Sequence, residues 1–420
     1  MVLFLAAVVL LVGCAAPSAP PITVTGRVVA FFDVPVPGVT VFVQGKTAVT
    51  DAEGRFTLDG IATPYDLLLG QAAGDGWWHL VEGLTEAAPR LGARWAAGGQ
   101  GFVADVNVSL TGGPIGPGRQ GIACFEGLDA PAMALAPVGL GEGGDAFAVP
   151  IASVGPGPVA VRLHLLEASL SAEGVPLAYH GYAAAEATLR EAVPTAIAVP
   201  PLAPVGSAIA SGTLVPPGGG QLVLVQLGIE LGPHANLTLY QRLNLMPGEP
   251  LAGTVSVPLP LVGAGFRLMG GAQVGGGSSL AWRVSDGPVL GTLALPVPPQ
   301  LLLPADGVAE VTAATLFVVA HATAGPVTFV WEPLAAGPRL ARTTALREAT
   351  MPEAPAVGLT LPPGAAYRWT VESHGPVDAA AATRVIPDAL GLSLFVPCAP
   401  GPTDDGQLTQ SSRRDLTLAP

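Results

Sequence analysis

The stretch Ile22-Thr23-Val24-Thr25-Gly26-Arg27-Val28 decides the fold of this chain. Ile22, Val24 and Val28 fall on one face of an extended segment, and the polar residues between them fall on the other. An apolar residue at every second position predicts a β-strand with one buried face. The same alternation recurs in several later stretches, among them 38–43, 106–110, 159–165 and 223–229.

The composition favours the same fold class. The 420 residues include 55 Gly and 44 Pro, which suit turns between short strands and disrupt helices. Hydrophobic residues make up 50% of the chain, so it has enough apolar surface to fold in spite of this turn-rich composition. We therefore predict an all-β protein.

The net charge of −13 excludes one class of partner. A chain of this charge is repelled by phosphate backbones and by anionic lipid head groups. We expect no binding to nucleic acid, and we expect any membrane attachment to come from a source other than electrostatic adsorption.

The order of the strand-like stretches predicts a tandem array of β-sandwiches. We expect domains at 22–112, 113–203, 204–297 and 298–398, followed by a flexible tail at 399–420. In such an array each domain contacts mainly its neighbours, so the row is expected to be linear.

Two of the expected domains share a weak internal repeat. The stretch 147–151, Phe-Ala-Val-Pro-Ile, recurs as Val-Ser-Val-Pro-Leu at 255–259, an offset of about 108 residues. Each unit ends in a similar strand, at 196–200 in the first unit and at 292–296 in the second. The domains at 113–203 and 204–297 are therefore expected to be related.

The first domain carries a family resemblance. Val36-Pro37-Gly38-Val39-Thr40-Val41, then the stretch 50–58, then Pro64-Tyr65-Asp66-Leu67, follow one known pattern. In this pattern the chain resembles the carboxypeptidase regulatory-like domain, a transthyretin-like β-sandwich. The resemblance implies an accessory module, because in carboxypeptidases it accompanies a catalytic zinc domain. No such zinc domain is visible in this sequence.

The last domain resembles a second class of sandwich. Strands are expected at 327–331 and 367–371, and the turn Pro363-Gly364 precedes the second of them. The segment is similar to fibronectin type III or immunoglobulin-like sandwiches. Trp331 and Trp369 are the expected core residues.

The first residues point to export. The run 1–13 is apolar throughout and, as a helix of about 20 Å, is too short to span a bilayer of about 30 Å. It ends in Leu11-Val12-Gly13-Cys14, which resembles the lipobox of bacterial lipoproteins, and 14–21 is a Pro/Ser/Ala linker. The resemblance implies a signal peptide at 1–13 and acyl chains on Cys14. Because Met1 to Phe4 lack the positive charge with which signal peptides usually begin, either the true start lies upstream or the signal is unusual. The alternative to lipidation is a signal peptide that is cut elsewhere, which would leave Cys14 as a small buried cysteine.

Lipidation at Cys14 sets the expected location and partners. We expect attachment to the cell envelope of a Gram-negative bacterium through the lipid anchor, and Ala15 favours the outer membrane. The expected partners are the membrane and a surface polysaccharide or an envelope protein. In that oxidising compartment Cys124 and Cys398 are permitted to pair, although two free, buried thiols are the favoured interpretation.

The sequence contains no recognisable catalytic or metal-binding motif. No two of the six histidines have the spacing of a helical or strand zinc site, and no nucleophile elbow or phosphate-binding loop is present. We therefore predict no enzyme activity, no metal and no cofactor.

Aromatic residues are the only candidate ligand contacts. Trp77 and Trp78 are consecutive, so in a strand one ring is expected to face outward and stack on a ligand such as a sugar. Tyr179 and Tyr182 form a second cluster with His180. The alternative is that these rings cover an open sandwich face or a contact between domains.

Three functional hypotheses follow. The first is a non-catalytic envelope lipoprotein that acts as a surface scaffold or binding module. The second is a carbohydrate-binding surface protein, and the third is an exported hydrolase whose site has no recognisable motif.

Overall fold

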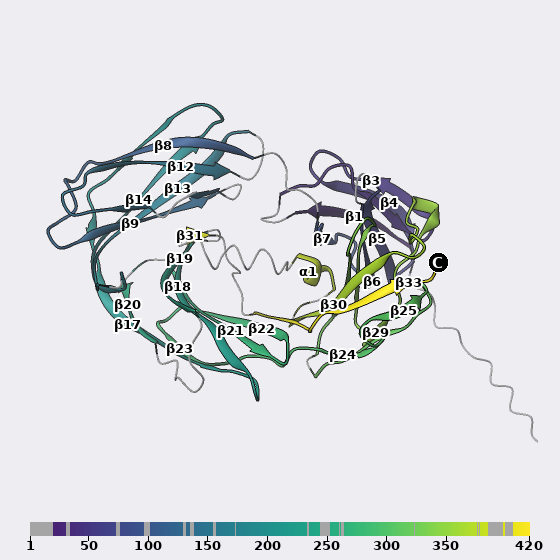
Figure 1. Ribbon diagram of the computed structural model, residues 1–420. Helices are drawn as coiled ribbons and strands as arrows, with labels where there is room; N and C mark the ends of the chain where they lie inside the picture. Colours follow the sequence, from purple (N-terminus) through teal and green to yellow (C-terminus); the bar gives the residue numbers. More distant parts are fainter. Residues whose placement is uncertain are drawn as a thin grey trace, which may run out of the picture.

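The computed structural model describes residues 20–30, 34–72, 76–95, 101–128, 132–134, 138–153, 157–172, 174–232, 235–243, 253–259, 261, 264–322, 324–375, 377, 379–384, 398–399 and 406–420. The regular structure of these residues is almost entirely β-strand (Figure 1). The described helices are short: α1 (Ala379–Arg384) and the 3-10 helix η2 (Pro355–Val357). The predicted all-β sandwich architecture is confirmed. Cys14 and the predicted signal peptide lie outside the described residues.

Sandwich 1 is formed by the first strands of the chain. One sheet has the order β4 (Arg55–Ile61), β1 (Ile22–Val29), β7 (Arg90–Gly92). The facing strands are β3 (Lys46–Val49), β2 (Thr40–Val43), β5 (Tyr65–Gln71) and β6 (Trp77–Leu84). As the alternation predicts, Val24 and Val28 of β1 are buried in the core between them.

Sandwich 2 follows, and it begins earlier than expected. Its first sheet is β10 (Ala132–Ala134), β12 (Ala146–Ser153), β8 (Phe102–Leu110), β15 (Thr195–Val199). Its second is β11 (Val138–Leu140), β9 (Gln120–Gly127), β13 (Val159–Leu170), β14 (Pro176–Leu189), β16 (Ala203–Pro204). The expected domain end at 112 is wrong, because β8 pairs with β12 and β15 of this sandwich. The alternation in β8 identified a strand but not its partners.

Sandwich 3 repeats this arrangement. A sheet of β20 (Gly253–Leu259), β17 (Gly206–Val215), β23 (Val289–Ala294) faces β22 (Gly277–Ser285), β21 (Gly265–Val274), β18 (Gln221–Gly232), β19 (Ala235–Leu243). In sandwiches 1, 2 and 3 the first strand pairs antiparallel with one neighbour and parallel with the last strand of its own sheet. The topology common to sandwiches 2 and 3 agrees with their weak sequence repeat, and sandwich 1 has it too.

Sandwich 4 has a different strand order. The sheet β24 (Gln300–Leu303), β26 (Phe317–Ala320), β29 (Glu348–Ala349) faces β28 (Arg339–Thr344), β27 (Val327–Pro333), β30 (Ala366–Gly375). Trp331 and Trp369 are fully buried, as expected, and each packs edge-on against Phe317. The remaining edge strand is β25 (Val308–Val311), which pairs with the C-terminal strand of the chain.

The predicted flexible tail is wrong for its described part. β32 (Gly406–Gln410) and β33 (Arg414–Leu418) both pair with β30. Leu408, Leu416 and Leu418 are buried. Three apolar side chains in two short alternating segments therefore fix the end of the chain in the fold.

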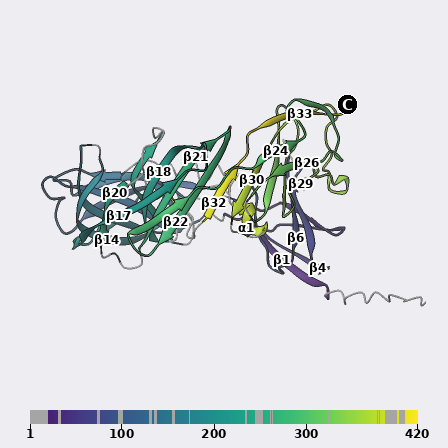
Figure 2. The ribbon, with the colours of Figure 1, turned by 90° about the horizontal axis from the view of Figure 1, so that it is seen from below.

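One sheet of 15 strands runs through three of the sandwiches. Its main path is β3-β2-β5-β6-β28-β27-β30-β32-β22-β21-β18-β19-β31, where β31 is Cys398–Ala399. Figure 2 shows β18, β21, β22, β32 and β30 side by side along it. Parallel pairing of β6 with β28 joins sandwich 1 to sandwich 4, so the first and last sandwiches are neighbours. The expectation of a linear row is wrong: the four sandwiches form an arch that returns on itself (Figure 1).

Candidate functional site

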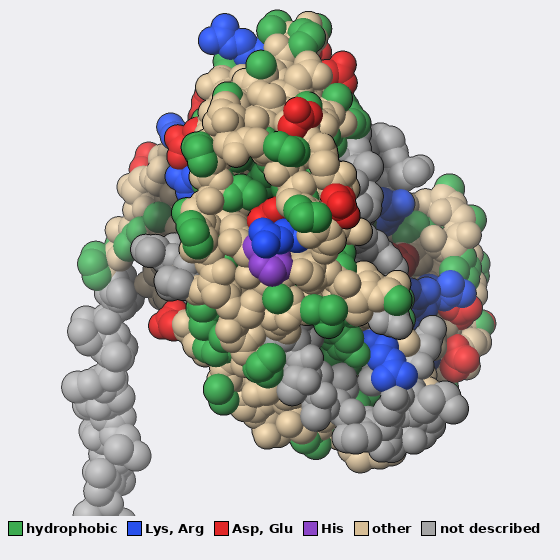
Figure 3. Space-filling model, turned by 90° about the vertical axis from the view of Figure 1, so that its left-hand side faces the viewer, with side chains coloured by type: hydrophobic (Ala, Val, Ile, Leu, Met, Phe, Trp, Pro, Cys, Tyr) green, Lys and Arg blue, Asp and Glu red, His purple; other side chains and the backbone are tan. Residues whose placement is uncertain are grey.

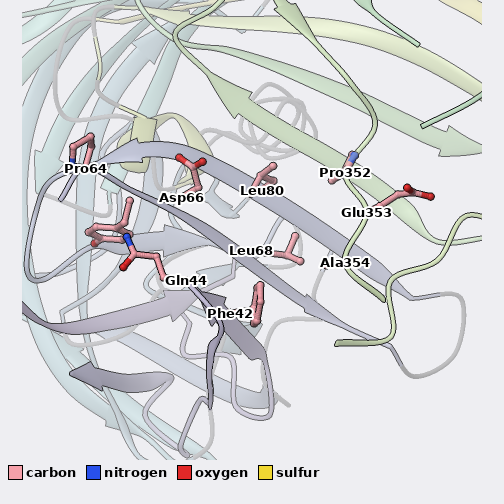
Figure 4. A pocket seen from close by; sticks show the side chains of 10 residues that line it. Phe42, Gln44, Pro64, Asp66, Leu68, Leu80, Pro352, Glu353 and Ala354 are labelled. Carbon is pink, nitrogen blue, oxygen red and sulfur yellow. The ribbon is translucent and has the colours of Figure 1, made fainter. Parts of the chain in front are cut away.

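A groove of about 510 Å³ lies where sandwich 1 meets sandwich 4. Its floor is the face of β2, β5 and β6 that points away from the core of sandwich 1, and its opposite wall is the segment Pro352 to Ala354 (Figure 4). This volume falls within the range of ligand sites in proteins. The floor and this wall come from parts of the chain that are far apart in sequence.

The floor of the groove is a row of cross-strand neighbours. Phe42 on β2 lies opposite Leu68 on β5, and Leu68 lies opposite Leu80 on β6. Because side chains alternate along a strand, all three point to the same face of the sheet. Phe42 and Leu80 are only partly buried, so apolar surface is left at the bottom of the groove.

The rim of the groove is polar and acidic. Asp66 and Glu353 are exposed, and Figure 4 shows them on opposite sides of the apolar floor. Asp66 Oδ1 accepts a hydrogen bond from the Gly83 N–H, whereas no cation of the described residues pairs with either carboxylate. The amide of Gln44 is already occupied, because it both donates to and accepts from the backbone of Ala62.

A buried polar junction holds sandwiches 1 and 4 together on the other face of the sheet. His79 Nε2 is 2.8 Å from Thr343 Oγ1, which is 2.8 Å from Thr328 Oγ1. Beside them, Arg94 donates two hydrogen bonds of 2.5 Å to the carboxylate of Glu372. Removing one partner of a buried ion pair is costly, so this junction keeps the two walls of the groove in a fixed relation.

The two tryptophans predicted to contact a ligand are both buried, and the expectation that one faces outward is wrong. Trp77 is 5% exposed, in the core of sandwich 1, and its Nε1 donates to Gln71 Oε1. Trp78 is 2% exposed and packs in the core of sandwich 4. The physical reason is that the sheet continues from β6 to its parallel neighbour β28, so each face of β6 is covered by a different sandwich.

The two tyrosines lie in the contact between sandwiches 2 and 3. Tyr179 is 3% exposed among the apolar residues of this contact, and burial raises its pKa above the usual range. Tyr182 is partly buried beside it, and its hydroxyl lies 2.9 Å from His164 Nδ1. Neither ring stands free on the surface, so the alternative interpretation, a contact between domains, describes both of them.

Tyr182 belongs to a chain of polar groups. His164 Nε2 is 3.2 Å from Glu126 Oε2, and Arg162 Nη1 is 3.3 Å from the same oxygen. Burial lowers the pKa of His164, although the adjacent Glu126 acts in the opposite direction. These contacts satisfy charges that the packing of two sandwiches buries.

One serine–histidine pair occurs in the described residues outside this network. Ser169 Oγ is 2.6 Å from His180 Nε2. A catalytic histidine is normally oriented by a third group, and none of the described carboxylates hydrogen-bonds to the other nitrogen of His180. Neither residue lines one of the described grooves.

The cysteines differ from the favoured expectation. Cys124 is disulfide-bonded and 1% exposed, so the prediction that it is a free thiol is wrong. The backbone of β31, which contains Cys398, pairs with β19 and lies beside β9, the strand of Cys124. The side chain of Cys398 lies outside the described residues, as does all of Cys14.

Within the described residues, no group of three or more His, Cys, Asp or Glu residues could hold a metal ion. None of the described helices has the length and apolar character needed to cross a bilayer.

On the side formed mainly by sandwiches 2 and 3, Figure 3 shows the hydrophobic side chains of the described residues scattered over the surface and not gathered in one patch. Scattered apolar side chains are normal on a protein surface, whereas contiguous patches indicate interaction sites.

No protein-family profile and no curated protein matches this chain.

The groove residues were missed at the level of sequence. A signal was present. Val39, Val41 and Val43 share one face of the strand, and Phe42 places a large apolar side chain on the opposite face, where a polar residue would be expected on an open surface. Apolar residues on both faces of a strand indicate that both faces are covered. The contribution of Glu353, more than 300 residues away, has no local signal.

Proposed function

We propose that this chain is a non-catalytic binding scaffold of the bacterial cell envelope, held to the membrane by acyl chains on Cys14. One observation carries the proposal: the β6–β28 pairing joins the two ends of the arch, and the groove lies at that joint. Strands of sandwich 1 form its floor and a segment of sandwich 4 forms its opposite wall, and a preformed site loses less conformational entropy on binding.

The carbohydrate-binding hypothesis loses one of the two observations that motivated it. It depended on the resemblance of the first domain to a transthyretin-like module and on an outward-facing aromatic ring, and the rings of Trp77 and Trp78 are both in hydrophobic cores. The floor of the groove is instead a row of apolar side chains, two of them aliphatic (Leu68 and Leu80), which suits an apolar side chain of a protein better than a sugar rich in hydroxyl groups. We therefore propose an envelope protein as the partner in preference to a polysaccharide.

Site-specific photo-cross-linking tests the proposal. A photoreactive phenylalanine analogue is placed at Phe42 in the full chain, expressed in its native cells and irradiated. The matched control carries the analogue at Val289, which is 74% exposed on β23 and far from the groove in the fold. We expect discrete protein adducts from position 42 and none of the same size from position 289.

The same experiment can refute the proposal. If position 42 gives no adduct, or if both positions give the same adducts, the groove is not a binding site and the scaffold function loses its support. Membrane fractionation of the same cells confirms that the cross-linked material is the anchored protein.

A further inference from the structure

The groove has a charge pattern that defines the chemistry of its occupant. Asp66 and Glu353 flank the apolar floor, and neither has a cationic partner among the described residues. The described lining contains no Lys, Arg or His. An anionic ligand would meet two like charges there, which disfavours binding.

We infer that the groove binds an extended polypeptide segment of a partner protein, in which a large apolar side chain is flanked by basic residues. This inference rests on the proposed function, and it names the class of partner. The apolar side chain packs on Phe42, Leu68 and Leu80, and the basic side chains reach the two carboxylates. Lys and Arg suit this position because their aliphatic stems cover apolar surface while their charged ends stay in water.

The position of the carboxylates favours a segment over a compact ligand. Asp66 is on β5 and Glu353 is on the opposite wall, with the apolar row between them (Figure 4). An occupant that contacts both acids and the floor must cross the groove. An extended chain does this, because its side chains project at regular intervals.

Fluorescence polarisation with the detergent-solubilised full chain tests the inference. The probe is a fluorescein-labelled peptide with one leucine and a lysine two residues to either side. Two matched peptides replace the lysines by glutamate or the leucine by serine. We expect the lysine–leucine peptide to bind about tenfold or more tightly than the glutamate peptide, and most of this preference to vanish at about 1 M salt, where charges are screened within about 3 Å.

Variants of the acidic rim localise the effect. Asp66→Asn and Glu353→Gln are each expected to weaken binding of the lysine–leucine peptide about two- to fivefold, as partly exposed ion pairs contribute little individually. Exposed carboxylates on sandwich 2 provide controls, and Asp105→Asn and Glu191→Gln are expected to leave binding unchanged. Circular dichroism shows whether each variant is folded.

The outcomes separate this inference from the proposed function. Equal binding of the lysine and glutamate peptides, or equal loss in the rim and control variants, overturns the cationic-segment inference. If adducts still form at position 42 in cells, the groove remains a binding site for a partner of other chemistry. If they do not form, the proposed function fails as well.

Discussion

His79 on β6 lies 2.8 Å from Thr343 on β28, although the two residues are 264 positions apart in the chain. Both are buried, at 1% and 0% exposure. The parallel pairing of β6 with β28 therefore includes a side-chain hydrogen bond that is shielded from water, in addition to its backbone ladder. Sandwiches 1 and 4 are joined as firmly as strands within one domain.

Removal of the Thr343 hydroxyl should weaken this joint. In Thr343→Val the shape is retained, but His79 Nε2 loses its partner, and its Nδ1 has none already. We expect the free energy of unfolding to fall by about 1–3 kcal/mol, the cost of an unsatisfied buried group. Urea denaturation measures the change. The exposed Thr360→Val serves as the control and should change stability little; equal effects would show that the hydrogen bond contributes nothing specific.

Acid should destabilise the fold before carboxylates titrate. Burial lowers the pKa of His79 to about 3 and that of His374 to about 4. The unfolded chain takes up these protons below about pH 6.5, while the folded chain resists them. The stability is therefore fully present above pH 6.5 and is lost as the pH falls, by up to about 1.4 kcal/mol per pH unit for each histidine.

Denaturation at pH 7, 6 and 5 measures this dependence. A His79→Gln, His374→Gln double variant should show a shallower decline with falling pH. Some decline should remain, because burial also lowers the pKa of His321 to about 4. A double variant whose decline matches that of the wild type would exclude these two histidines as its cause.

The Cys124 disulfide should stabilise the contact between sandwiches 2 and 3, where Cys124 is buried. We expect reduction to lower the free energy of unfolding by about 2–4 kcal/mol. The same reductant should have no further effect on Cys124→Ala. Peptide mapping of the unreduced protein identifies the partner cysteine, which we expect to be Cys398 because the backbone of β31 lies beside β9.

Membrane attachment should depend on Cys14. We expect Cys14→Ser to abolish labelling with palmitate and to release the protein from the membrane fraction, because stable anchoring needs acyl chains. Cys124→Ala should retain both properties. Labelling of the Cys14→Ser protein at the wild-type level would refute the anchor.

Local patterns predicted the strands well but not their partners. The alternation of Ile22, Val24 and Val28 correctly predicted β1, and Trp331 and Trp369 are core residues as expected. Alternation tells which side chains share a face, because it follows from backbone geometry. It does not tell what covers the second face.

The failures all involve long-range pairing. One ring of Trp77 and Trp78 was expected on an open surface, but the sheet continues from β6 to β28, and Trp78 lies in the core of sandwich 4. Leu416 and Leu418 alternate with polar residues, yet the segment is short, and its pairing with β30 is set by tertiary structure. The groove could not be predicted either, since Leu80 and Glu353 meet only after the arch has closed.

The joint between β6 and β28 forms late in synthesis, because the two strands are far apart in the chain. When sandwich 1 leaves the ribosome, its strand β6 has no neighbour on one side, and it keeps an open edge until the last quarter of the chain arrives. Unpaired edges recruit other strands, and pairing across such distances is slow. A nascent or truncated chain that ends before β28 should therefore aggregate through β6, and a chaperone that binds extended strands would protect it during this interval.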